Sequence, residues 1–144
     1  MPIAAGFTEL EHTADVGFRA YAPSLPGLFY QAARALLHVL FLRPPRRGKS
    51  TLTFTVEAED PETLLVRFLN ELLYQIQTRG RVPAGLYLHL EKAGEGCRLT
   101  ARMRYAPFDP EAYGFLGEVK SATFHGLKVE KTEAGYAASV VLDV

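Results

Sequence analysis

The sequence predicts an α+β domain, with a mixed or antiparallel sheet covered by two main helices, and three observations support that class. Strand-type and helix-type periodicities alternate twice in the first half of the chain, and the second half holds successive strand patterns joined by short turns. Of the 144 residues, 48% are hydrophobic, which is enough for a substantial core. No repeat, low-complexity tract or change of composition divides residues 1–144, so we expect a single domain.

The first predicted strand and helix follow from local patterns. Residues 16–21 alternate between apolar and polar side chains, as a half-buried strand does. Ser24 suits the N-cap of the helix that follows, and Pro26 fits its first turn. Apolar residues then recur at helical spacing as far as Leu42, where this helix is expected to end.

A loop, a strand and a second helix come next. Prolines and a glycine in residues 43–49 predict a loop, and residues 51–58 alternate as a strand. Asp60 then provides an N-cap and Pro61 the first helical position. Apolar residues form a helical stripe over residues 64–76. The polar face opposite this stripe comprises Arg67, Asn70, Glu71 and Gln75.

The second half of the chain is expected to be mostly strands. Residues 86–91 and 97–103 alternate and are joined by a turn at residues 93–96. Two prolines and two glycines predict an irregular loop over residues 105–117. Three further strands are expected at residues 119–125, 127–131 and 136–143.

Composition excludes several classes of protein. Lys+Arg and Asp+Glu both number 16, so no global charge favours nucleic acid or a membrane surface as the partner. The single cysteine, Cys97, excludes an internal disulfide and a cysteine-rich zinc site, and a cytoplasmic location is the simplest expectation. No segment has the length and apolarity of a signal peptide or membrane helix. A glycine-rich phosphate loop and a nucleophile elbow are also missing from the sequence.

Positive charge is concentrated in the loop at residues 43–49. Its four basic residues are Arg43, Arg46, Arg47 and Lys49. They could hold RNA phosphates or an acidic partner surface, or they could simply be solvated. No aromatic residue is interleaved with them in the sequence, so a stacking platform for single-stranded RNA is not indicated there.

Polar chemistry is concentrated near both ends of the chain. The segment Glu11–Gly17 contains an imidazole, a hydroxyl and two carboxylates, one of them from Asp15. Asp143 and the terminal carboxylate of Val144 offer further negative oxygens. If the two ends meet, three carboxylates converge and require a proton or a hard cation such as Ca²⁺ or Mg²⁺. The alternative is that Asp15 caps a turn and the C-terminus frays in water.

Other single residues also leave two interpretations open. His12 could be a ligand or an acid–base group, or it could bond only to the backbone. In the predicted strand at residues 119–125, Thr123 and His125 share one face, while Lys120 and Phe124 share the other. Either pair could line a site, or one face of the strand could simply be exposed to solvent.

Four sequence blocks together resemble the archease family. They are Glu11–Gly17, Leu64–Tyr74, Val119–Val129 and Val141–Val144, and they occur in the family's order over essentially the full chain. The resemblance implies a small accessory protein of the GTP-dependent tRNA-splicing ligase, which rejoins cleaved RNA ends. Such a protein promotes guanylylation of the ligase with GTP and its multiple turnover in tRNA splicing and RNA repair. It is not itself an enzyme, and it would meet tRNA only through the ligase.

The resemblance also implies a divalent cation, described as calcium in the family. By position its ligands are Asp15, Asp143 and Val144, and Lys120 corresponds to a further functional residue. His12, Thr13 and Glu71 lie within the matching blocks without an assigned role.

Two other functions remain open from the residues alone. One is a stand-alone metal-dependent hydrolase using Asp15, Asp143 and His12. The other is a general chaperone or RNA-binding modulator of tRNA-modifying enzymes that makes contact through residues 43–49.

Overall fold

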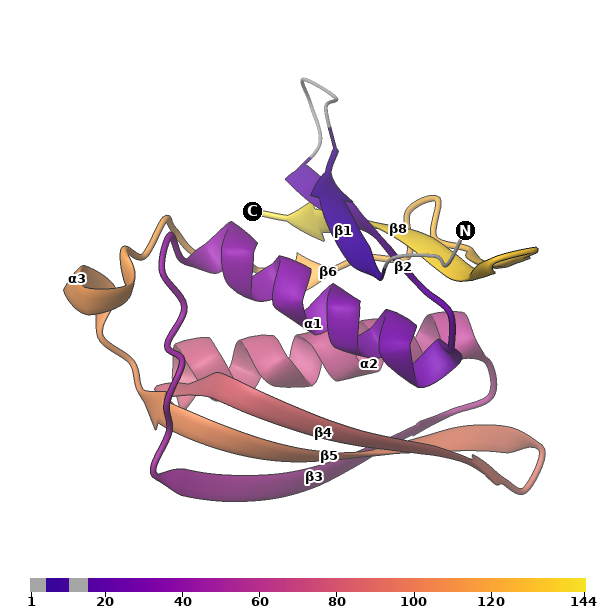
Figure 1. The fold of residues 1–144 in the computed structure, drawn as a ribbon, viewed down its shortest axis with the longest axis horizontal. Helices are drawn as coiled ribbons and strands as arrows, with labels where there is room; N and C mark the ends of the chain where they lie inside the picture. Colours follow the sequence, from indigo (N-terminus) through magenta and orange to yellow (C-terminus); the bar gives the residue numbers. More distant parts are fainter. Residues whose placement is uncertain (1–4, 11–15) are drawn as a thin grey trace.

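The fold has a layer of helices between two antiparallel sheets (Figure 1). The structure is a computed structural model that describes residues 5–10 and 16–144. The predicted α+β class is confirmed. The sequence did not distinguish one sheet from two, because alternation identifies a strand but not its partners.

The first sheet contains both the beginning and the end of the described chain. Its strands are β1 (Gly6–Glu9), β2 (Val16–Ala22), β6 (Ser121–Ala122), β7 (Val129–Thr132) and β8 (Gly135–Asp143). The strand order is β1-β2-β8-β6, and β7 also pairs with β8. Strand β8 is therefore the centre of this sheet, because β2 lies along one of its edges and the short β6 and β7 lie along the other.

The second sheet is a three-stranded layer of longer strands. It contains β3 (Ser50–Ala58), β4 (Arg81–Ala93) and β5 (Gly96–Pro107) in the order β3-β5-β4. Its inner face packs apolar side chains such as Leu99 and Met103 into the core. Its outer face is polar, and in Figure 1 no helix or strand of the described chain lies against it.

The two main helices, α1 and α2, begin where the sequence predicts. The helical segments are α1 (Leu25–Leu40), α2 (Pro61–Leu73), the π-helical segment η1 (Tyr74–Thr78) and α3 (Pro110–Tyr113). The Ser24 hydroxyl accepts a hydrogen bond from the Gly27 N–H at 3.1 Å, and the Asp60 carboxylate accepts one from the Thr63 N–H at 2.7 Å. Both side chains therefore satisfy free N–H groups in a first helical turn.

The core fills the space between the two sheets. Phe18, Phe29 and Phe68 are fully buried, from β2, α1 and α2 respectively. The rings of Phe29 and Phe68 are 6.0 Å apart, and Phe68 also stacks with Phe54 of β3 at 6.2 Å. This chain of aromatic contacts joins both helices to the second sheet and fixes the layers relative to one another.

The structure differs from the sequence prediction in three places. Residues 6–9 form a strand that the sequence reading missed, and β5 extends through Pro107 into the region predicted as irregular loop, which also contains α3. The predicted strand at residues 119–125 shrinks to Ser121–Ala122, because the chain turns at His125 and Gly126. Gly126 has a φ of 64°, a left-handed conformation that alternation does not reveal.

Among the described residues, no helix is long and apolar enough to cross a membrane.

Candidate functional site

The C-terminal end of β8 lies between two other strands of the first sheet. Leu142 pairs with Val16 at the start of β2, and Asp143 pairs with Ser121 of β6. The C-terminal residues therefore lie beside β2, the strand that begins directly after residue 15. Sequence alone suggested that the two ends might meet, and the register of β2 with β8 brings Val16 opposite Leu142.

Several predicted site residues fall on that segment. His12, Thr13 and Asp15 lie outside the described residues, together with Glu11. The predicted convergence of the Asp15 and Asp143 carboxylates therefore stays a prediction. Within residues 5–10 and 16–144, no three His, Cys, Asp or Glu side chains cluster closely enough to hold a metal ion.

The predicted residues at the C-terminal end are exposed. The side chains of Asp143 and Lys120 reach solvent, and 57% of the surface of Val144 is accessible. The Lys120 N–H donates to the Asp143 main-chain carbonyl at 2.7 Å, which holds the two residues side by side through their backbones. In the described part of the chain, no side chain forms an ion pair with Asp143 or Lys120. Both charged groups are thus available to a ligand or partner.

Two side-chain amides, one from α2 and one from η1, hold the backbone on either side of Lys120. Asn70 accepts from the Ala122 N–H at 2.7 Å and donates to the Ala122 carbonyl at 3.3 Å. Gln77 accepts from the Val119 N–H at 2.9 Å and donates to the Val119 carbonyl at 2.7 Å. Each amide satisfies both polar groups of one residue, as a neighbouring strand would. We call Asn70 and Gln77 the amide clamp.

The sequence pattern does not predict the amide clamp. Asn70 was assigned to the polar face of its helix, but it points at β6 instead of solvent. Gln75 was assigned to the same face and is buried, where its amide donates to Glu71 at 2.9 Å. Gln77 lies within the π-helical segment η1, whose turns are wider than those of an α-helix. The partners of Asn70 and Gln77 are more than 40 residues away in sequence, so helical periodicity cannot identify them.

The loop after β6 continues this exposed edge. The Thr123 hydroxyl donates to the Val141 carbonyl at 3.0 Å and accepts from the His125 N–H at 3.3 Å. Thr123 is therefore a structural residue that fixes the turn. Phe124 is 56% exposed and His125 is exposed. This apolar ring close to β8 is a feature that a protein partner could cover.

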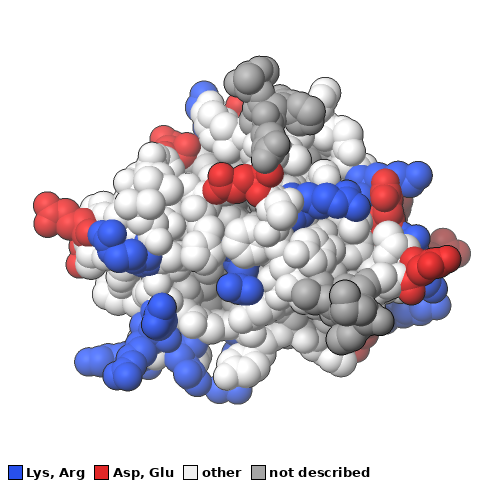
Figure 2. Space-filling view, turned by 45° about the horizontal axis from the view of Figure 1, so that its top comes forward, with Lys and Arg blue, Asp and Glu red and all other residues white. Residues whose placement is uncertain are grey.

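The basic loop at residues 43–49 borders a groove. The Arg43 guanidinium donates to the carbonyls of Glu111 and Ala112 at 3.4 Å each, so this residue ties the loop to α3. Arg46, Arg47 and Lys49 are exposed. The groove has a volume of about 550 Å³ and runs between this loop, α1 and the start of β4. Figure 2 shows Lys and Arg gathered at its lower left, toward the end of the molecule where the α1–β3 connection runs in Figure 1.

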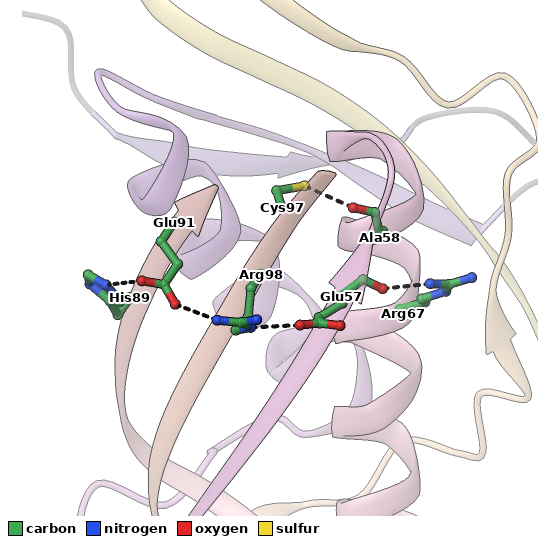
Figure 3. A network of polar contacts seen from close by, with 7 residues as sticks. All are labelled: Glu57, Ala58, Arg67, His89, Glu91, Cys97 and Arg98. Atoms are coloured by element: carbon green, nitrogen blue, oxygen red, sulfur yellow. Dashed lines mark hydrogen bonds and ion pairs between the residues drawn. The ribbon is translucent and has the colours of Figure 1, made fainter. Parts of the chain in front are cut away.

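Cys97 is not set up as a nucleophile. Burial raises the pKa of its thiol above the ordinary value, with a smaller contribution from the Asp60 charge. Its sulfur lies 3.5 Å from the Ala58 carbonyl, as a weak donor would (Figure 3). A neutral thiol in this position packs rather than reacts.

The exposed oxygens of Asp143 and Val144 have the chemistry that a hard cation requires. Carboxylate oxygens are the ligands that Ca²⁺ and Mg²⁺ prefer, and neither carboxylate is engaged by a described side chain. Two carboxylates alone make a weak site, so a third donor is needed.

Comparisons with known proteins show the family and the fold of the chain. The chain matches the Archease protein family (MTH1598/TM1083) over residues 7–144. It is 37% identical over 135 residues to "Protein archease" of Pyrococcus abyssi, which covers 93% of this chain and 95% of the relative. It is similar in structure to Methanobacterium thermoautotrophicum protein 1598, with a TM-score of 0.79, 27% identity, and 96% and 99% of the two chains covered.

A more distant solved structure shares the fold. It is described as an archease, possible chaperone, from Thermotoga maritima. The TM-score is 0.57 at 20% identity, with 95% of this chain and 96% of that chain covered.

Proposed function

The chain belongs to the archease family, and from this premise we propose that it is an accessory protein of the GTP-dependent tRNA-splicing ligase. In this role it promotes guanylylation of the ligase with GTP and multiple turnover in tRNA splicing and RNA repair. It does not itself join RNA, and it meets tRNA through the ligase. The Thermotoga maritima relative is described as a possible chaperone, which is compatible with a protein that assists another.

One observation carries the proposal, namely the exposed C-terminal end of β8. Asp143 is held through its main chain, by Lys120 and by pairing with Ser121, while its side chain is exposed. A carboxylate with no structural obligation in the described part of the chain is free for a ligand. The site lies at the C-terminal end of the central strand β8 and is exposed, so a partner protein can reach it.

The third donor that this site needs is Asp15. Val16, which follows Asp15 in the sequence, pairs with Leu142, which precedes Asp143. We therefore propose that Asp15, Asp143 and the Val144 carboxylate hold Ca²⁺ or another divalent cation.

The cation and Lys120 have complementary parts in this proposal. A bound cation would neutralise the carboxylates and accept further oxygens, such as those of a phosphate or a ligase carboxylate. Lys120 lies next to Asp143 along the sheet edge and provides a mobile positive charge. Together they form a tip that can bind acidic or phosphate groups in the ligase active site. His12 lies in the same sequence block as Asp15 and is a lower-ranked candidate for the same tip.

The test is multiple-turnover ligation of tRNA halves by the ligase with GTP. Asp15→Ala and Asp143→Asn should reduce the number of turnovers toward that of the ligase alone. Glu133→Gln is the matched control, because Glu133 is an exposed carboxylate in the turn before β8. Full activation by correctly folded Asp15 and Asp143 variants would reject the proposal.

The same preparation distinguishes the alternatives. A stand-alone hydrolase would turn over RNA or nucleotides without the ligase, whereas the proposed accessory protein gives no product alone. If contact were made through residues 43–49, then the double substitution Arg46→Glu and Arg47→Glu would abolish activation and leave cation binding intact.

A further inference from the structure

The outer face of the β3-β5-β4 sheet is open and has an ordered pattern of side chains. Figure 1 shows α1 and α2 on the inner face, with no element of the described chain on the other. The three strands pair in register, so outward residues form rows across the sheet. From one end to the other, these rows are Thr51–Arg104–Gly85, Thr53–Arg102–Tyr87, Thr55–Thr100–His89 and Glu57–Arg98–Glu91.

In the row that contains two carboxylates, the arginine forms ion pairs with both of them. Arg98 pairs with Glu57 at 2.7 Å and with Glu91 at 3.0 Å, and Glu91 also lies 3.4 Å from His89 (Figure 3). The hydrogen bond from Arg98 lowers the pKa of the Glu91 carboxyl, and the two carboxylates raise the pKa of Arg98. This arginine therefore has little charge to offer to an outside ligand.

In the rows at the other end of the sheet, the arginines have no carboxylate opposite them on the neighbouring strands. Arg102 and Arg104 are exposed, and their cross-strand neighbours are threonines, a tyrosine and a glycine. Among the described residues, neither guanidinium forms an ion pair or a side-chain hydrogen bond. Two positive charges thus lie two residues apart on one strand with no carboxylate opposite them.

An exposed aromatic ring lies beside these arginines. Tyr87 is 61% exposed and is directly opposite Arg102. Gly85 is opposite Arg104 and adds no side chain to the face. The recess that results has a volume of about 290 Å³ and is lined by Thr51, Tyr87, Arg102 and Arg104.

The basic loop approaches the same end of the sheet. Lys49 directly precedes β3, whose first residue, Ser50, pairs with Tyr105. Gly48 lies so close to the backbone of Tyr105 that a Cβ would meet its carbonyl oxygen at 2.5 Å. The charges of Arg47 and Lys49 therefore extend the field of Arg102 and Arg104, whereas Arg98 with its two carboxylates lies at the far end.

We propose that this end of the outer sheet face binds single-stranded RNA. Arginines that track phosphates and an exposed aromatic ring on which a base stacks are the two parts of a single-strand site, and they lie here in adjacent positions. The hydroxyls of Thr51 and Thr53 can donate to and accept from a ribose 2′-OH, which favours RNA over DNA. The missing aromatic partner of the basic loop is thus supplied by Tyr87 of β4, 38 residues after Lys49 in the chain.

This inference does not depend on the proposed function, because it concerns the opposite sheet and can be tested without the ligase. Binding of a fluorescein-labelled, unstructured RNA dodecamer to the whole protein is measured by anisotropy at several salt concentrations. Tyr87→Leu should weaken binding by about five- to a hundredfold, whereas Tyr87→Phe, which keeps the ring, should bind as the wild type does. Arg102→Gln and Arg104→Gln should each lower the slope of log affinity against log salt by about 0.7.

Arg98→Gln is the matched control. It removes one arginine from the same strand and face, but one whose charge is already neutralised. Affinity for RNA should change less than twofold, and circular dichroism should confirm that every variant is folded. Equal losses from Arg98→Gln and Arg102→Gln would overturn the proposal, because they would show an effect of net charge alone.

Competing ligands complete the test. DNA of the same sequence and the RNA duplex should bind more weakly than the single-stranded RNA. A polyglutamate peptide that binds as tightly as RNA, with no loss in Tyr87→Leu, would show a surface for acidic proteins and would overturn the proposal. No measurable RNA binding at low salt would also overturn it.

Discussion

Asp143 owes its position to its main chain and not to its carboxylate. The carbonyl accepts from the Lys120 N–H, and the residue pairs with Ser121, while the side chain is exposed. Changing the carboxylate should therefore alter ligand binding without unfolding the strand. This separation is why Asp143→Asn is an informative variant.

Asp60 offers a prediction about stability and pH. The hydrogen bond from the Thr63 N–H lowers the pKa of its carboxyl from the ordinary value of 3.8. Because the folded pKa is lowered, the ionised carboxylate stabilises the fold above that ordinary value, and the contribution is lost as the pH falls through the lowered pKa. Asp60→Ala should cost about 1 kcal/mol at neutral pH, measured by urea unfolding.

The control for this prediction is Asp60→Asn, which keeps an N-cap oxygen but does not titrate. The stability difference between wild type and Asp60→Ala should shrink at about pH 3, whereas the difference between the Asn and Ala variants should persist. A wild-type advantage over Asp60→Ala that is independent of pH would contradict the assigned role of the ionised carboxylate.

At this scale the sequence predicts local interactions well and distant ones poorly. Ser24 and Asp60 were identified as caps because each bonds to an N–H three residues further along the chain. Asn70 was misassigned because its partner, Ala122, is 52 residues away. A polar residue on a helix face has the same sequence pattern whether it meets water or a distant backbone.

Among the elements, β6 depends most on its neighbours. It has only two residues, and a two-residue strand has little stability of its own. It is held on one side by β8 and on the other by Asn70, while Gln77 holds Val119, which precedes β6. Lys120 precedes it directly, so the clamp also positions the lysine of the proposed tip.

Removal of the clamp should therefore affect both stability and function. Asn70→Ala leaves the Ala122 N–H and carbonyl without their partner and should cost about 2 kcal/mol, or roughly 4–8 °C in melting temperature. Activation of the ligase should fall as well, because Lys120 loses its support. Asn70→Asp keeps the acceptor but loses the donor, and its loss should be intermediate.

Hydrogen exchange provides the check on this prediction. The Ala122 amide should exchange faster in Asn70→Ala than in the wild type, while amides in β3 and β5 keep their protection. Unchanged melting and unchanged exchange at Ala122 would show that the clamp is not what holds β6.

The two sheets show which features alternation in the sequence does not predict. Alternation located β2, β3 and β8 to within one residue at each end, whereas β4 begins and β5 ends several residues beyond the predicted ranges. It missed β1 and did not separate the two sheets, since pairing depends on contacts between segments far apart in the chain. The open outer face with Tyr87, Arg102 and Arg104 became visible only from the register of β4 with β5.

At the scale of the whole molecule, charge is balanced but unevenly distributed. The chain has 16 basic and 16 acidic residues, yet arginines and lysines gather at one end of the second sheet. The exposed Asp143 ends β8 in the other sheet, and the exposed Val144 follows it. We infer two separate surfaces, a cation-bearing tip for the ligase and a sheet face for RNA.

We propose that the two ends of the chain form one cation site, and calorimetric titration with Ca²⁺ can measure it. One cation should bind per chain, with affinity lowered about tenfold or more by Asp15→Asn, by Asp143→Asn, and by a few residues added after Val144 to move the terminal carboxylate. Glu133→Gln should bind as the wild type does. Wild-type affinity in the Asp15 and Asp143 variants would show that the two ends do not share a cation.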